Sequence, residues 1–244
     1  YETALAAAIA SAGPAADRAG ARKVKAVIRS LGTLAKTDQI DARALARYGT
    51  ERADRLDRWH PTDTTGAQLQ ALVLTRRDIV AARTAWNNRR KAPGAHAVTA
   101  ILDPIIASFD AQLKAIDKTI AVLVKSTALA ARARILQAIP GIGATTAHSL
   151  LALMPELGTL SPKQAASLAG LAPHPRKSGN RDAYRRIKGG RPIVRQALFM
   201  AALAATRANP QLKAFYQRLI ANGKKPLVAI TVSVVWWPQF RPLV

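Results

Sequence analysis

The chain has no cysteine among its 244 residues, and only 5% of its residues are aromatic. The absence of cysteine excludes disulfide bonds, thiolate zinc sites and cysteine nucleophiles, and it fits a reducing compartment. Acidic residues are also scarce, 14 against 37 lysines and arginines, so the formal charge is +23. A charge of this size predicts a polyanionic partner. With 49% hydrophobic residues, the chain still has enough apolar side chains to bury a core.

Long hydrophobic runs are missing as well. The apolar stretch near the end, Leu227 to Trp237, has 11 residues and includes two hydroxyl side chains. A bilayer-spanning helix needs about 20 residues, so we expect no membrane span. The chain begins with Tyr1 and shows no basic and then apolar leader, so we expect it to be the inner part of a longer protein.

The positive charge is concentrated towards the end of the chain. Residues 174–244 contain 14 lysines and arginines and a single acidic residue, Asp182. A stretch with one carboxylate is unable to pair its charges internally, so it favours binding of nucleic acid. Simple solubility and attraction to a membrane surface are the alternatives.

The periodicity predicts a mainly helical fold with at most a small α/β part before Trp59. Apolar residues recur at steps of three and four over 68–88 and again over 97–134, which predicts a long helical hairpin. This hairpin would act as a coiled coil that dimerises, or it would pack onto its own chain. Residues 135–228 predict a compact helical domain with an Arg-rich loop from Leu171 to Pro192.

A Pro-Gly-hydrophobe-Gly turn stands between two helical segments in residues 136–151. The sequence Ile139-Pro-Gly-Ile-Gly143 is typical of a helix-hairpin-helix, in which Gly141 and Gly143 let backbone N–H groups approach a phosphate without reading bases. A tight turn between two packed helices is the alternative.

Two short patterns are candidates for chemistry. Asp38 and Asp41 stand at i and i+3 and so share one face of a helix, where they would hold a divalent cation or merely cap the helix. Ser178 stands in a basic cluster, whose arginines could orient a scissile phosphate while the hydroxyl attacks it; otherwise Ser178-Gly179 is a plain turn. The basic residues of this region are Arg176, Lys177, Arg181, Arg185, Arg186, Lys188, Arg191 and Arg195.

The four histidines do not fall at the spacings of a metal site. His60, His96 and His148 are scattered, and only His174, inside the basic loop, is a candidate for a phosphate contact.

Taken in order, these segments resemble the insertion-sequence transposases that are guided by a bridge RNA, the "110" insertion-sequence family. The resemblance rests on residues 34–42, the helical hairpin, Ile139 to Gly143, Leu171 to Gly179 and Gly189 to Arg195, and it extends to about residue 229. It implies an RNase H-like, resolvase-like domain whose Asp, Glu, Asp, Asp quartet binds Mg²⁺, followed by a transposase domain with a nucleophilic serine.

Carried onto this chain, the resemblance makes Asp38 and Asp41 the last two acids of the quartet and Ser178 the nucleophile. It implies DNA and a bridge RNA as partners, a homo-oligomer (dimer or tetramer) in which the serine of one protomer works beside the acids of another, and a cytoplasmic, nucleoid-associated location. The implied parts are a remnant of the catalytic domain (1–60), the hairpin (61–134), the transposase domain (135–228) and an atypical tail (229–244).

The chain departs from this family in three places. The first aspartate and the glutamate of the quartet would lie before Tyr1, so half of the metal ligands are absent from these residues and we expect this form to be inactive. Residues 14–20 stand where the family has an apolar strand. After Ala229 a basic helix is replaced by Thr231 to Pro242, as a shifted reading frame would produce. A non-catalytic DNA- or RNA-binding protein is the alternative function.

Overall fold

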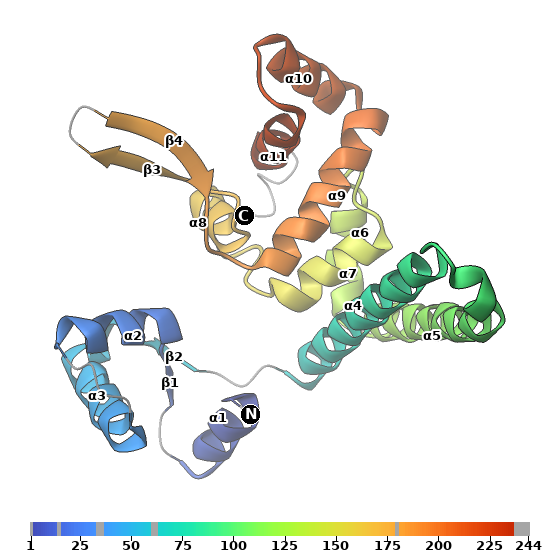
Figure 1. The fold of residues 1–244 in the computed structure, drawn as a ribbon. Coiled ribbons are helices and arrows are strands. Elements are labelled where there is room, and N and C mark those ends of the chain that lie inside the picture. The colour runs from blue at the N-terminus through green and yellow to red at the C-terminus, as the bar shows by residue number, and fades with distance from the viewer. Residues whose placement is uncertain (1, 14–15, 33–36, 60–62, 179–180, 237–244) are drawn as a thin grey trace. The chain divides into compact units, whose positions relative to one another are not determined.

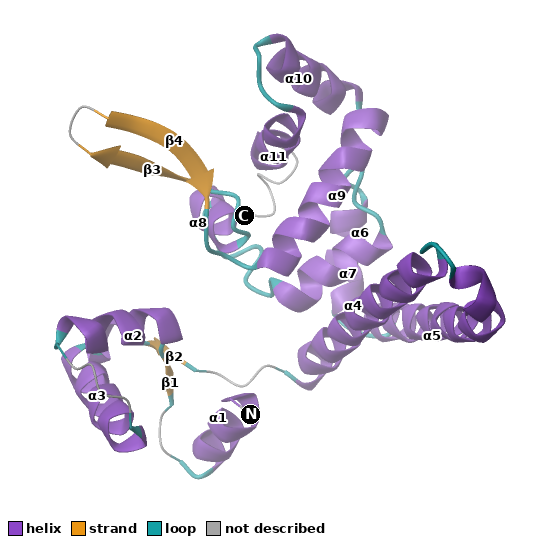
Figure 2. Ribbon diagram, in the orientation of Figure 1, coloured by secondary structure: helices purple, strands orange, loops and turns teal. Residues whose placement is uncertain are grey.

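The computed structural model describes residues 2–13, 16–32, 37–59, 63–178 and 181–236. For residues 2–4, 18, 57–58, 176–178, 181–185 and 235–236 it describes the backbone alone. The chain forms two compact units, Tyr1–Thr62 and Asp63–Val244 (Figure 1). Most described residues are helical (Figure 2), which confirms the prediction of a mainly helical protein. Of the residues named above, those outside the described ranges include Tyr1, residues 14–15, residues 34–36, His60, Gly179 and residues 237–244.

The first unit is a small α/β arrangement. Its strands are two residues long and pair antiparallel, with Asp17 opposite Arg58. The longest helix begins at a Thr37 cap, whose Oγ1 accepts a hydrogen bond of 3.2 Å from the Ile40 N–H. That this unit is a remnant of an RNase H-like domain stays a prediction. Its elements are α1 (Glu2–Ser11), β1 (Asp17–Arg18), α2 (Ala21–Ser30), α3 (Asp38–Glu51), η1 (Ala53–Arg55) and β2 (Asp57–Arg58).

The second unit contains the long helices and one β-hairpin (Figure 2). Several of its helices begin with proline at the first position, where the missing N–H is harmless, and Ser161 with Gln164 forms a capping box. The elements are α4 (Thr64–Arg90), η2 (Ala95–Val98), α5 (Thr99–Lys125), α6 (Leu129–Gln137), α7 (Ala144–Leu153), α8 (Pro162–Leu168), β3 (Pro173–Ser178), β4 (Arg181–Ile187), α9 (Pro192–Ala208), α10 (Pro210–Ala221) and α11 (Pro226–Trp236).

Helices α4 and α5 form the predicted antiparallel hairpin and pack on each other. Three ion pairs join the two helices. Their arginines are spaced seven residues apart along α4, and their aspartates are spaced seven residues apart in the opposite direction along α5, as in an antiparallel coiled coil. Leu69, Val73, Ile120 and Val124 are buried where the hairpin meets the rest of the unit. The ion pairs are Arg76–Asp117 at 2.5 Å, Arg83–Asp110 at 2.8 Å and Arg90–Asp103 at 2.7 Å.

The second arm of the hairpin differs from the prediction. A single helix was expected over 97–134, whereas α5 ends at Lys125 and α6 begins at Leu129. Ser126 and Thr127 occupy the break, and their hydroxyls donate to the Leu123 carbonyl at 3.3 and 2.9 Å. Such side-chain bonds to the backbone compete with helix continuation. The short helix α6 therefore turns away to join α7.

The core of the second unit lies around α9. This helix packs against α7, α10 and α11, and Val194 and Leu198 are buried between them. Leu150 and Met154 from the end of α7, with Leu212 from α10, complete this centre. Full burial of each such side chain stabilises the fold by about 1.5–3 kcal/mol. The same cluster supports the segments that hold the basic β-hairpin.

The structure bears on two further predictions. The Arg-rich segment expected as a loop over 171–192 instead forms the antiparallel hairpin β3–β4, which projects from the helices (Figure 1). After Ala229 the chain was expected to depart from a basic helix, and α11 remains helical to Trp236 but has no basic residue from Thr231 on. Ile230 and Val234 of α11 are buried against the core, and this packing outweighs the low helix propensity of β-branched residues.

None of the helices within the described ranges combines the length and the apolar character that crossing a membrane requires.

Candidate nucleic-acid interface

The register of the β-hairpin brings the predicted serine and three predicted basic residues to one end of two strands. Ser178 is the last residue of β3 and stands opposite Arg181, the first of β4. Lys177 stands opposite Asp182, and Arg176 opposite Ala183. Two strands joined by a short connection thus carry Ser178 to the tip of a basic ribbon. These positions come from the backbone alone, so the role of each side chain stays a prediction.

Nearer the base of the hairpin, basic side chains are exposed. His174 stands opposite Arg186 across the strands, and both are exposed. Lys188 follows β4 and is exposed as well. In the part of the chain that the structure describes, neither Arg186 nor Lys188 has a carboxylate partner. Exposed cations without internal partners are free to attract phosphate groups.

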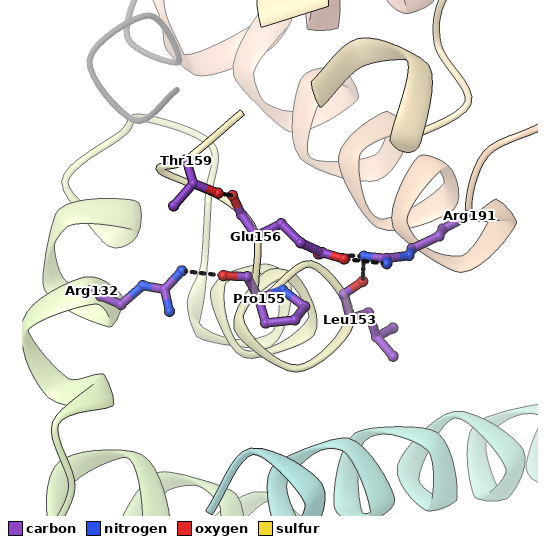
Figure 3. A network of polar contacts seen from close by, with 6 residues as sticks. All are labelled: Arg132, Leu153, Pro155, Glu156, Thr159 and Arg191. Carbon is purple, nitrogen blue, oxygen red and sulfur yellow. Dashed lines mark hydrogen bonds and ion pairs between the residues drawn. The ribbon is translucent and has the colours of Figure 1, made fainter. Parts of the chain in front are cut away.

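Arg191 differs from these residues because its guanidinium group is hydrogen-bonded to oxygens of the protein itself. Nη1 and Nη2 donate to the two carboxylate oxygens of Glu156 at 2.7 and 2.6 Å, and Nη1 also donates to the Leu153 carbonyl at 2.8 Å (Figure 3). The hydrogen bonds from Arg191 hold the pKa of the Glu156 carboxyl below its usual range, although partial burial opposes this shift. The pair fixes the chain between β4 and α9 to the turn after α7.

The same turn is held from its other side. Arg132 of α6 donates from Nη2 to the carbonyls of Pro155 and Leu157 at 3.1 and 2.8 Å. Figure 3 shows Arg132 and Arg191 approaching the segment Leu153 to Thr159 from different elements. Sequence reasoning missed Arg132 and Glu156. The only available signal was that Glu156 is an isolated acid in a basic domain.

A second contact closes the base of the hairpin. Arg195 donates from Nη1 to the carbonyls of Gly170 and Gly189 at 3.1 and 3.2 Å. Gly170 and Gly190 both have positive φ and touch, since a Cβ on Gly190 would lie 2.2 Å from the Gly170 nitrogen. The segments before β3 and after β4 therefore cross at a point that admits only glycine. Arg191 and Arg195 act here as structural residues of the hairpin base.

The two glycines of the α6–α7 turn have different surroundings. Gly141 has φ +98°, and a Cβ there would lie 2.5 Å from the Ala205 Cβ of α9, so the turn packs tightly on that helix. Gly143 is exposed with open space beside it, and it precedes α7 without a side-chain cap. The first N–H groups of α7 are thus left for an external acceptor such as a phosphate. The structure explains Gly141 by packing, and the backbone contact stays a prediction.

Asp38 and Asp41 lie in the first turn of α3, where Asp38 is exposed and Asp41 is partly exposed. Their carboxylate oxygens are the type of donor that Mg²⁺ prefers. They supply two donors, however, and within the described ranges no three His, Asp or Glu side chains gather as a metal site would require. The described residues do not make up the implied ligand set.

Comparison with known proteins agrees with this arrangement. Residues 133–217, which contain the α6–α7 turn and the basic hairpin, match the family described as Transposase IS116/IS110/IS902 family. Residues 18–92 match a transposase family of the DEDD type of IS110 elements.

Named relatives cover most of the chain. The Pilin gene-inverting protein of Moraxella bovis is 33% identical over 236 residues, which span 90% of this chain and 71% of that protein. Its counterpart in Moraxella lacunata matches equally. A 43.6 kDa protein of the insertion element IS110 from Streptomyces coelicolor is 31% identical over 138 residues, 54% of this chain and 33% of that protein. The chain therefore belongs to the IS116/IS110/IS902 family of transposases, DNA-binding recombinases that depend on a divalent metal.

Proposed function

We propose that the basic β-hairpin and the α6–α7 turn hold DNA by its phosphates, and that Ser178 is the nucleophile that cleaves one strand and transfers it. The observation that carries the proposal is the register of β3–β4, which places Ser178 at the tip of the basic ribbon, opposite Arg181. The proposed phosphate contacts are the backbone near Gly143 and the side chains of Arg176, Lys177, Arg181, Arg185, Arg186 and Lys188.

Arg191 and Arg195 contribute to this function indirectly. Both hold the base of the hairpin through bonds to the chain's own oxygens. A rigid base is needed because a nucleophile must be held close to its phosphate in a fixed direction. Arg191 at the base of the β-hairpin is bonded to Glu156 in the turn after α7. Helix α7 therefore connects the β-hairpin with the α6–α7 turn.

The reaction proposed for Ser178 is a transesterification. Its hydroxyl oxygen attacks a DNA phosphorus, the bond from phosphorus to one strand breaks, and a serine phosphodiester forms. The proton lost by the serine is balanced by the proton that the leaving strand end takes up as a hydroxyl. A serine hydroxyl is a weak nucleophile at neutral pH, so neighbouring cations must stabilise the charge that develops on the phosphate.

The acidic cluster, the RNA and the oligomer belong to the same proposal. Asp38 and Asp41 are proposed as two ligands of a Mg²⁺ ion, and a guide RNA and a homo-oligomer follow from the family resemblance. Exposed apolar side chains on α5 support association of the helical hairpin with another copy, since Ile101 is 65% exposed and Val122 is 59% exposed. The relatives named for inverting pilin genes support a site-specific recombination reaction.

A second candidate function is DNA or RNA binding without chemistry. It is favoured by the exposed cations Arg186 and Lys188, which would attract phosphate groups whether or not Ser178 reacts. Both functions share the DNA-binding surface and differ in whether a covalent bond to DNA forms.

Trapping of a covalent adduct separates the two functions. A protein in which the chain is extended at its start to include the first Asp and the Glu of the quartet is incubated with end-labelled DNA and Mg²⁺. Adducts that resist denaturing detergent are counted for this protein, its Ser178→Ala variant and the control Ser167→Ala, which alters an exposed serine of α8. The nucleophile proposal expects an adduct that Ser178→Ala abolishes and Ser167→Ala retains. An adduct that survives Ser178→Ala refutes the serine assignment. DNA binding without any adduct supports the second function.

A further inference from the structure

A pocket of about 270 Å³ lies among helices α4, α5, α7 and α9, beside the start of α7. These helices belong to one unit (Figure 1). Its apolar wall includes Val73 and Ile120, which are buried, and Ile193 of α9. Polar side chains, among them Arg76 and His148, also line it. A small, mostly apolar pocket with a few polar groups is the usual form of a site for a small ring-shaped ligand.

Arg76 gives this pocket a flat and rigid surface. Its Nε and Nη2 donate to the two carboxylate oxygens of Asp117 at 2.5 and 3.1 Å, so two bonds fix the plane of the guanidinium group. The side chain is 24% exposed, and its charge is offset by Asp117. A guanidinium plane held in this way is a surface on which nucleobases stack.

Two polar side chains of the pocket have free hydrogen-bonding capacity. Within the described ranges neither His148 of α7 nor Gln196 of α9 has a hydrogen-bond partner. Burial lowers the pKa of His148, so its imidazole is neutral at pH 7 and presents one donor and one acceptor nitrogen. The Gln196 side-chain amide is exposed and also has both a hydrogen-bond donor and an acceptor. Groups that both donate and accept match the edge of a nucleobase.

We propose that this pocket receives one unpaired nucleobase of the bound nucleic acid, which stacks on Arg76 and bonds to His148 and Gln196. The inference rests on the proposed DNA binding. The pocket adjoins the start of α7, where free backbone N–H groups would hold the phosphate of the same nucleotide. The volume admits one flat ring system and excludes a peptide helix. Exchange of strands between duplexes leaves bases unpaired, so such bases are present during the proposed reaction.

The test compares two DNA duplexes that differ by one nucleotide. One is fully paired, and the other has a single unpaired nucleotide as a bulge. Stacking of one base is worth roughly 1–3 kcal/mol, so the chain should bind the bulged duplex about tenfold more tightly. Ala197→Leu fills the pocket and should abolish the preference while binding of the paired duplex is retained. Ala204→Leu makes the same change at an exposed site of α9 and should leave the preference intact.

A second variant is needed in case Ala197→Leu fails to fold, and thermal unfolding of each variant shows whether it is folded. Gln196→Ala removes only an exposed amide and should lower the preference a few-fold. An RNA with the same bulge shows whether the base belongs to DNA or RNA, and either source supports the pocket. Equal binding of the two duplexes in both DNA and RNA, or an unchanged preference in folded Ala197→Leu, would overturn the inference. Failure to bind even the paired duplex would refute the proposed function itself.

Discussion

Arginine has two different uses in the helical hairpin and in the basic β-hairpin. Between α4 and α5, three arginines at steps of seven residues are each paired with an aspartate of the facing helix. On β3–β4 the basic residues far outnumber the single acid of the segment, Asp182, and the described cations Arg186 and Lys188 have no carboxylate partner in the part that is described. The number of basic residues is therefore high in both hairpins, and the scarcity of local carboxylates is what distinguishes the proposed binding surface.

The base of the β-hairpin stands between these two cases. Arg191 belongs to the basic segment in the sequence, yet it is paired with Glu156 as firmly as the arginines of α4 are paired. Within a few residues the chain changes from cations that face outward to a cation that holds the fold. The following predictions test this division, in order of decreasing effect.

The largest effect should follow removal of the basic residues of the β-hairpin. A variant with glutamine at Arg176, Lys177, Arg181, Arg185, Arg186 and Lys188 should bind duplex DNA on the order of a thousandfold more weakly at 0.1 M salt, because several phosphate contacts are lost. The control replaces the paired arginines Arg83 and Arg90 with glutamine and should change DNA affinity less than threefold. Fluorescence anisotropy with labelled DNA measures both. Similar losses in both variants would contradict the division.

A glycine exchange in the α6–α7 turn should affect stability next most strongly. Gly141→Ala forces an alanine into a positive φ and places its Cβ against Ala205, so we expect a loss of about 2–3 kcal/mol in the free energy of unfolding. Gly143→Ala meets open space at φ −81° and should cost less than about 1 kcal/mol. Urea denaturation of both variants checks the difference. Equal losses would show that the turn does not pack on α9 as described.

Loss of the Glu156 carboxylate should have a smaller and pH-dependent effect. Its pKa is lower in the folded chain, so its contribution is present above the unfolded value of about 4.3 and is lost as the pH falls through the folded pKa. Because Glu156 is more than a third exposed, solvent screens the pair, and Glu156→Gln should cost about 1 kcal/mol at pH 7. Wild type and variant should converge in stability below pH 4. Parallel curves over pH 3–7 would refute this role.

The smallest effect concerns one exposed ion pair of the helical hairpin. Arg83→Gln removes the pair with Asp110, whose side chains are 41% and 49% exposed. Such pairs contribute about 0.5 kcal/mol, so the melting temperature should fall by only one or two degrees. High salt should reduce the difference between variant and wild type. A loss several times larger would mean that the spacing by seven residues has a cooperative role.

Local patterns in the sequence predicted much of the fold. The recurrence of apolar residues at intervals of three and four correctly indicated α4 and α5. The sequence Pro140 to Gly143 indicated the turn between α6 and α7. The spacing of Arg76, Arg83 and Arg90 by seven residues was also visible in the sequence and could have predicted their partners. Such features are encoded within one or two neighbouring elements, so they need no knowledge of the tertiary structure.

Features that depend on distant residues were missed or misjudged. The strands β3 and β4 lack an alternation of apolar side chains, so nothing local distinguished a hairpin from a loop. The helix α11 contains β-branched residues that become helical only because α9 and α10 bury them. Likewise, the bonds from Arg191 to Glu156 join residues 35 positions apart, and the sequence showed Arg191 merely as one more cation of a basic cluster.

The salt dependence of DNA binding tests the central claim most directly. If the basic residues of the β-hairpin neutralise roughly six phosphates, a plot of log K against log salt concentration should have a slope of about −5 for the wild type. The slope should fall close to zero in the variant with six glutamines and remain near −5 in the variant that alters Arg83 and Arg90. A wild-type slope near zero, or a steep slope that survives in the six-glutamine variant, would contradict the account.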